Sequence, residues 1–93
     1  FNFVAGKLLT NQNHKKYSNL SIKYLERYIN QYSSADRFSL DETYYLLAYS
    51  NFKLGNENSR HFIKLSKEVA MNSEKRNYSL IKKIDELNKL INR

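Results

Sequence analysis

Proline is absent from this 93-residue chain, and glycine occurs at only two positions. Tight turns between β-strands rely on these two residue types, glycine for positive φ angles and proline for a fixed φ. No stretch shows apolar and polar residues alternating between turn dipeptides, which would indicate half-buried strands. We therefore predict an all-α fold, and the short chain indicates one domain over residues 1–93.

The run DETYYLLAYSNFKLG, from Asp41 to Gly55, carries clear helix signals and predicts a helix near 41–54. Ser39 or Asp41 can cap its start, and the acidic Asp41 and Glu42 in the first turn suit the positive end of the helix dipole. Apolar residues then recur at helical spacing, and the small side chain of Ala48 would let a partner helix approach closely. Gly55 can adopt the left-handed conformation in which many helices end.

A second amphipathic run, SRHFIKLSKEVA, begins at Ser59 after a short polar turn and predicts a helix near 59–72. Four of its apolar residues can pack back on the preceding helix: Phe62, Ile63, Val69 and Ala70. Two helices joined by so short a turn form an antiparallel helical hairpin, here over about 41–72.

Two earlier helices are predicted near 1–10 and 17–33, which would form a first hairpin over about 1–33. A glycine inside a helix costs about 1 kcal/mol relative to alanine, so we expect Gly6 to lie at a close packing contact. The polar stretch over residues 10–19 is expected to be a loop between the two helices.

A last helix is predicted near 75–91, as a cap over the second hairpin. Four apolar residues form its stripe, and three more would widen it: Leu80, Ile84, Leu87 and Ile91, then Tyr78, Ile81 and Leu90. A stripe shorter than two heptads is too short for a stable coiled coil, so we expect the helix to dock on the domain.

Motifs for catalysis and metal binding are missing from the sequence. It has no glycine-rich phosphate loop, no H-E-x-x-H pair and no G-x-S-x-G turn, and the lack of cysteine excludes disulfides and thiolate zinc sites. Adjacent acidic residues such as Asp85 and Glu86 point about 100° apart on a helix, so they do not form a carboxylate pair. We expect a protein that is not an enzyme and needs no cofactor and no metal.

The net charge of +7 has two interpretations. Solvated helix faces explain it most simply, and a basic surface that attracts nucleic acid or anionic lipid is the alternative. No apolar run approaches the ~20 residues that span a bilayer, and no signal peptide is visible. We expect the chain itself to be soluble.

The order of these segments resembles the mitochondrial fission 1 protein family, tail-anchored adaptors with a tetratricopeptide-like helical domain. The matching pieces are FNFVAGKLL, SIKYLERYI, YLLAYSNFKLG with SRHFIKLSKE, and the terminal LIKKIDELNKLI. The resemblance implies two tetratricopeptide-like hairpins and a C-terminal capping helix. The family's N-terminal arm and first helix would precede Phe1 and its membrane anchor would follow Arg93, so any contact with a membrane would come through an anchor outside this chain.

The resemblance also implies a function and a binding site. The protein would be an adaptor on the cytosolic side of the outer mitochondrial or peroxisomal membrane, recruiting a dynamin-like GTPase or its adaptor for organelle fission. In tetratricopeptide hairpins the first helix of each pair lines a concave groove that holds the partner. The matching groove positions are Phe3, Lys7, Glu42, Tyr45, Tyr49, Phe52 and Lys53, whereas Tyr44, Leu47 and Ala48 match structural positions. An uncovered groove would also favour self-association.

Two other functions fit the same sequence. A tetratricopeptide-type module of another system would bind a different peptide in the same groove. A basic helical nucleic-acid binder would depend on salt-sensitive contacts of Lys and Arg with phosphate, without specific recognition of a sequence. Each tyrosine of the predicted groove also has a structural alternative, in which it only packs within the fold.

Overall fold

The computed structural model describes residues 4, 6–8, 15–30, 40–73 and 76–92. Its helices are α2 (Lys15–Asn30), α3 (Leu40–Lys53), α4 (Asn58–Met71) and α5 (Tyr78–Ile91), and residues 4 and 6–8 are also helical. No strand occurs in these ranges. The predicted all-α class is therefore confirmed for the described part of the chain.

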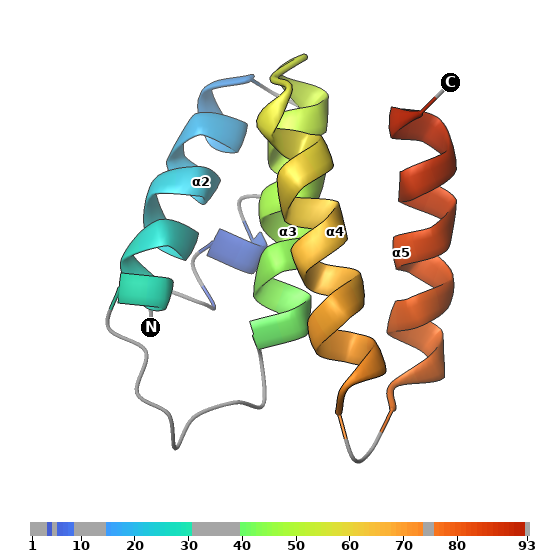
Figure 1. Ribbon diagram of the computed structural model, residues 1–93. Helices are drawn as coiled ribbons and strands as arrows, with labels where there is room; N and C mark the ends of the chain where they lie inside the picture. Colours follow the sequence, from blue (N-terminus) through green and yellow to red (C-terminus); the bar gives the residue numbers. More distant parts are fainter. Residues whose placement is uncertain (1–3, 5, 9–14, 31–39, 74–75, 93) are drawn as a thin grey trace.

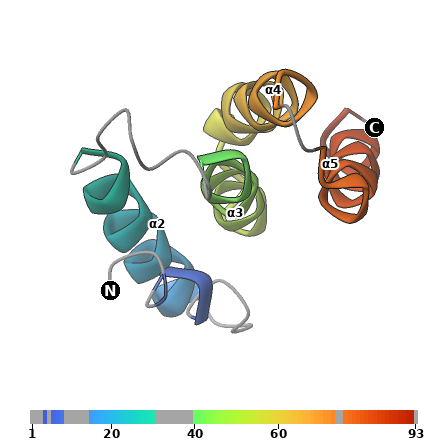
Figure 2. The ribbon, with the colours of Figure 1, turned by 90° about the horizontal axis from the view of Figure 1, so that it is seen from below.

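Successive helices run in opposite directions, so α3 and α5 run in the same direction (Figure 1). α3 packs most extensively on α4 and also contacts α2, while α5 packs mainly on α4. Seen from below, α2 and α5 lie on opposite sides of α3 (Figure 2). α3 is therefore the central helix, with neighbours on several sides. The antiparallel pair of α3 and α4 has the geometry expected near 41–72, and its assignment to the tetratricopeptide class stays a prediction.

α3 ends in a Schellman motif centred on Gly55, whose φ angle is +72°. The Gly55 amide donates to the carbonyl of Phe52 at 3.0 Å, and the Asn56 amide donates to the carbonyl of Asn51 at 2.8 Å. These bonds satisfy carbonyls that the end of a helix leaves without partners. The prediction that Gly55 ends this helix in the left-handed conformation is confirmed.

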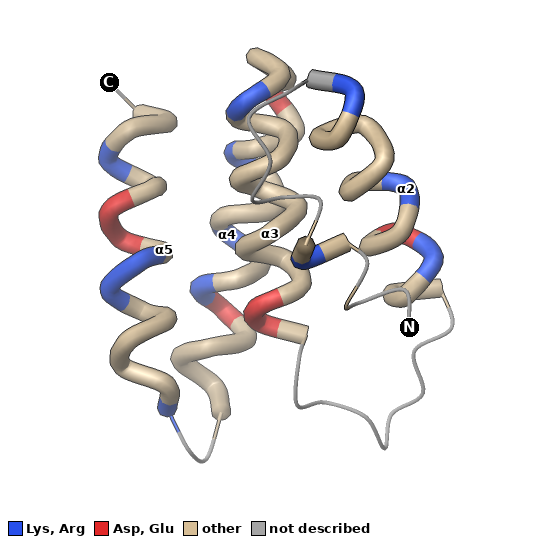
Figure 3. The backbone as a smooth tube through the Cα atoms, turned by 180° about the vertical axis from the view of Figure 1, so that it is seen from behind, with Lys and Arg blue, Asp and Glu red and all other residues tan. Residues whose placement is uncertain are grey.

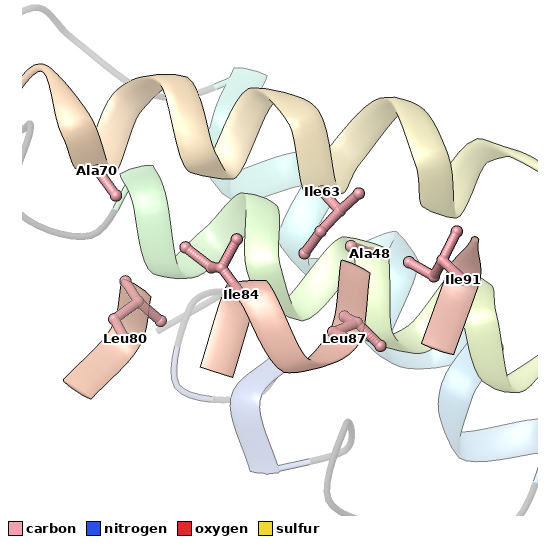
Figure 4. Close-up of a cluster of buried hydrophobic side chains, with 7 residues drawn as sticks. All are labelled: Ala48, Ile63, Ala70, Leu80, Ile84, Leu87 and Ile91. Carbon is pink, nitrogen blue, oxygen red and sulfur yellow. The ribbon is translucent and has the colours of Figure 1, made fainter. Parts of the chain in front are cut away.

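The C-terminal core lies between α3, α4 and α5 (Figure 4). It consists of seven buried apolar residues: Ala48, Ile63, Ala70, Leu80, Ile84, Leu87 and Ile91. The predicted stripe of α5 is thus confirmed. The expectation that Tyr78 and Leu90 widen the stripe is wrong, because these side chains are 73% and 43% exposed. Both lie outside the narrow face that α5 turns to the core.

The N-terminal core contains, among the described residues, Leu25 of α2 with Leu46 and Leu47 of α3. Gly6 packs against it: a Cβ atom at this position would lie 2.6 Å from Cγ of Leu25, which is far inside van der Waals contact. The predicted close contact at Gly6 is confirmed. The Ser21 hydroxyl donates to the Gly6 carbonyl at 2.9 Å and joins this segment to α2.

Two predicted boundaries are corrected by local interactions. α2 begins at Lys15, two residues before the start predicted near residue 17, so the stretch 10–19 expected to be a loop is helical from residue 15 onward and Ser18 is buried. α5 begins at Tyr78 rather than near residue 75, because the side chain of Asn77 accepts a hydrogen bond from the Leu80 amide at 3.1 Å and caps the helix. Residues 31–33 of the predicted second helix lie outside the described residues.

Candidate functional site

Five of the predicted groove residues lie together on one side of α3. Because an α-helix turns once every 3.6 residues, residues four apart stand above one another and residues three apart flank them. We call this side of α3 the inner face, and it consists of Glu42, Tyr45, Tyr49, Phe52 and Lys53. α4 packs on a different side of α3 (Figure 2), and each of the five side chains keeps part of its surface exposed.

Lys7 joins the inner face from the N-terminal segment. Its Nζ atom lies 2.7 Å from Oε1 of Glu42, and the two side chains are 49% and 32% exposed. Figure 3 shows the basic turn of this segment beside the acidic first turn of α3. An ion pair in contact with water contributes about 1 kcal/mol or less, so it orients the segment more than it stabilises the fold. Phe3, the remaining predicted residue, lies outside the described residues.

Tyr45, Tyr49 and Lys53 form a continuous row along the inner face. The two tyrosine rings meet edge to face, with centroids 6.2 Å apart. The Lys53 Nζ atom lies 4.6 Å from the centroid of the Tyr49 ring, which is a favourable cation–π geometry. The row therefore presents two aromatic rings and an ammonium group at successive helical turns.

Burial and neighbouring charge alter the titration of two groups in this row. Burial raises the pKa of Tyr45, and the nearby Tyr49 and Glu86 raise it further. Burial also lowers the pKa of Lys53. Because burial disfavours the ammonium form, an anion bound beside Lys53 would recover part of that cost. Glu86 belongs to α5, so α5 contributes to the electrostatics of the inner face.

The same tyrosines also belong to the packing of the domain. Tyr45 and Tyr49 pack against the C-terminal core while remaining partly exposed. Each ring therefore has one side in the fold and another available for a ligand. The assignment of the row as a binding site stays a prediction, because packing within the fold accounts for part of each ring.

Several residues near the inner face were not predicted as part of the site. Val4 and Leu8 are 57% and 63% exposed. They lie one helical turn apart, and each is two residues from Gly6, which faces Leu25, so both point away from α2. On α5, Glu86 and the exposed Leu90 are also one turn apart. Their i, i+4 spacing was visible in the sequence, but the direction they face was not.

A second surface feature lies away from the inner face, between α2 and α4. It is an open hollow of about 360 Å³. Seven residues line it: Glu26, Ile29, Asn30, Tyr44, His61, Phe62 and Leu65. Its floor includes the stacked rings of Tyr44 and Phe62, whose centroids are 6.3 Å apart. The stacking shows that Tyr44 packs within the fold.

The described residues contain no group of three or more His, Cys, Asp or Glu side chains arranged to hold a metal ion. None of the described helices is long and apolar enough to cross a membrane. Comparison of the chain with protein-family models, curated proteins and solved structures finds no match in any of the three.

Proposed function

We propose that this chain is a protein-interaction module whose inner face binds a segment of a partner protein. The observation that carries this proposal is the row of Tyr45, Tyr49 and Lys53, which aligns two aromatic rings and a cation on one side of the central helix. Tyrosine is enriched among the residues that dominate binding energy, because it buries a large rigid surface and keeps a hydroxyl for hydrogen bonding.

Exposed apolar surface beside the row supports the same function. Phe52 at the end of the inner face is 37% exposed, and Val4 and Leu8 add more apolar area from the N-terminal segment. Apolar side chains that gather around one surface are typical of binding sites. A partner segment with apolar anchors would bury these groups together with the tyrosine rings.

We further propose that the module acts as an adaptor on the outer mitochondrial or peroxisomal membrane and recruits a dynamin-like GTPase or its adaptor for organelle fission. This step is supported by the resemblance in segment order to the fission 1 family, and the all-helical fold is compatible with it. A membrane anchor outside these 93 residues would hold the protein in place. A dynamin-like GTPase from the same organism is therefore the partner to test first.

The proposal is tested by replacing both tyrosines of the row with alanine. Tyr45→Ala with Tyr49→Ala should weaken binding of the partner by roughly 1–3 kcal/mol if these rings are anchors, with helicity largely unchanged. Titration calorimetry and circular dichroism on the same variant measure the two quantities. Tyr78→Ala is the control, because this tyrosine is 73% exposed and lies at the start of α5.

The opposite pattern would refute the assignment. A variant that loses stability but binds its partner with unchanged affinity would make both tyrosines core residues only. Binding of random-sequence DNA with a steep salt dependence would instead favour the nucleic-acid alternative, because that slope reports release of counterions from phosphate.

A further inference from the structure

α5 turns one of its flanks toward the inner face. Asp85 accepts a hydrogen bond from Lys67 of α4 at 2.9 Å, so the Asp85 side of α5 faces α4. Glu86 lies about 100° further around the helix, on the other side of the buried stripe. Tyr45 and Tyr49 of the inner face pack against the core to which the buried stripe of α5 belongs, so this flank borders the inner face. The flank of α5 that carries Glu86 therefore extends the surface formed by the inner face of α3.

Leu90 extends this flank by one helical turn. It is four residues after Glu86 and is 43% exposed. Because α3 and α5 run in the same direction (Figure 1), the step from Glu86 to Leu90 parallels the step from Tyr45 to Tyr49. Leu90 thus adds an apolar side chain at about the level of the second tyrosine, where the sequence pattern had assigned it to the core.

The charges along this surface have a defined order. Glu86 is close enough to raise the pKa of Tyr45, and Lys53 follows Tyr45 by two turns of α3, an axial distance of about 12 Å at 1.5 Å per residue. In Figure 3 the acidic turn of α5 stands between basic turns. Within the described residues, Glu86 has no ion-pair partner. A carboxylate and an ammonium group are thus separated by apolar and aromatic side chains.

The order of charged and apolar side chains defines which partner segment fits this surface, an inference that rests on the proposed function. We propose that the inner face, together with Glu86 and Leu90, binds an amphipathic helix of a partner protein. That helix places a Lys or Arg beside Glu86 and an Asp or Glu beside Lys53. Large apolar side chains between the two charges pack on the tyrosine rings and on Leu90. Residues seven apart on a helix share a face and span about 10.5 Å, which is close to the axial step of about 12 Å from Tyr45 to Lys53.

The test uses two synthetic, alanine-rich peptides of 20 residues that are helical in isolation. One carries Lys and Glu seven residues apart with two leucines between them, and the other carries Gln in place of both charges. Fluorescence anisotropy with the complete 93-residue chain measures both affinities. We expect the charged peptide to bind roughly tenfold more tightly at low salt, and the advantage to shrink as salt is added.

Matched variants test whether the higher affinity of the charged peptide comes from the named side chains. Glu86→Gln should reduce the tenfold ratio of the two peptide affinities to roughly threefold. Glu68→Gln, the same change on the exposed side of α4, should leave the ratio unchanged. Leu90→Ala should weaken the binding of both peptides about fivefold without altering the fold. Met71→Ala is its control, because Met71 is exposed to a similar degree on another helix.

The outcomes separate this inference from the proposed function. If both peptides bind equally and the double tyrosine variant abolishes that binding, the inner face is a binding site and the charge order is wrong. If Leu90→Ala has no more effect than Met71→Ala, α5 is not part of the surface. If the charged peptide fails to bind, or binds the double tyrosine variant as well as the unmodified chain, both proposals are overturned.

Discussion

The two sides of α3 are packed by different physical means. Toward α4 and α5, the interface is a cluster of seven buried apolar residues with Ile84 completely buried (Figure 4). Toward α2, the buried apolar residues among those described are three leucines with partly buried neighbours such as Ile22 and Ile29, and buried hydroxyl groups add to the contact. The hydroxyls of Ser21 and Ser50 lie 3.1 Å apart across the interface.

This difference indicates which changes each half should tolerate. An apolar cluster is stabilised by the area that it buries, so it is most sensitive to polarity and lost volume. An interface of glycine and serine depends on close approach, and each buried hydroxyl needs a hydrogen-bond partner. The C-terminal half should therefore respond most to a buried charge, and the N-terminal half to added size.

The largest expected effect comes from a charge placed in the C-terminal core. Ile84→Asp would bury a carboxylate among apolar side chains and should lower the free energy of unfolding by about 4 kcal/mol or more. Urea denaturation followed by circular dichroism measures it. Lys82→Asp, on the exposed side of the same helix, should change the free energy by less than about 1 kcal/mol. Equal unfolding midpoints for the two variants would show that α5 is not docked.

An intermediate effect is expected from added volume in the N-terminal half. Gly6→Val should cost about 2 kcal/mol, because its Cβ would meet Leu25 at 2.6 Å. Combining it with Leu25→Ala removes the clashing atoms, so the two costs should sum to less than their separate values. Val4→Ala is the control, since this side chain is exposed. Urea denaturation of the two single variants and of their combination measures the costs. Additive costs would contradict the close contact.

The smallest expected effect concerns the buried hydroxyl. Ser21→Ala removes the donor to the Gly6 carbonyl and the contact with Ser50, and should cost about 1 kcal/mol. Ser79→Ala, at an exposed position, should cost much less. If thermal unfolding shifts equally for both variants, the hydroxyl contacts do not stabilise the N-terminal half.

Much of the helical framework could be predicted because its signals are local. The spacing of Leu80, Ile84 and Leu87 marks the buried side of α5 through the 3.6-residue repeat alone. Gly55 marks the end of α3 because few other residues adopt a positive φ angle. Asn77 carries a local signal as well, because asparagine is a favoured N-cap residue and its side chain caps α5. The composition of the inner face likewise follows from helical spacing once α3 is known.

The tertiary structure alone decided which flank of each helix meets which neighbour. Helical spacing places Leu90 next to the stripe of α5, yet only the packing of α5 on α4 leaves it exposed beside the inner face. The ion pair of Lys7 with Glu42 joins residues 35 positions apart, and no local pattern encodes that distance. Backbone geometry acts over about four residues and so determines the helices. The side chains that meet across the chain depend on the summed packing of all elements, which determines the surface available to a partner.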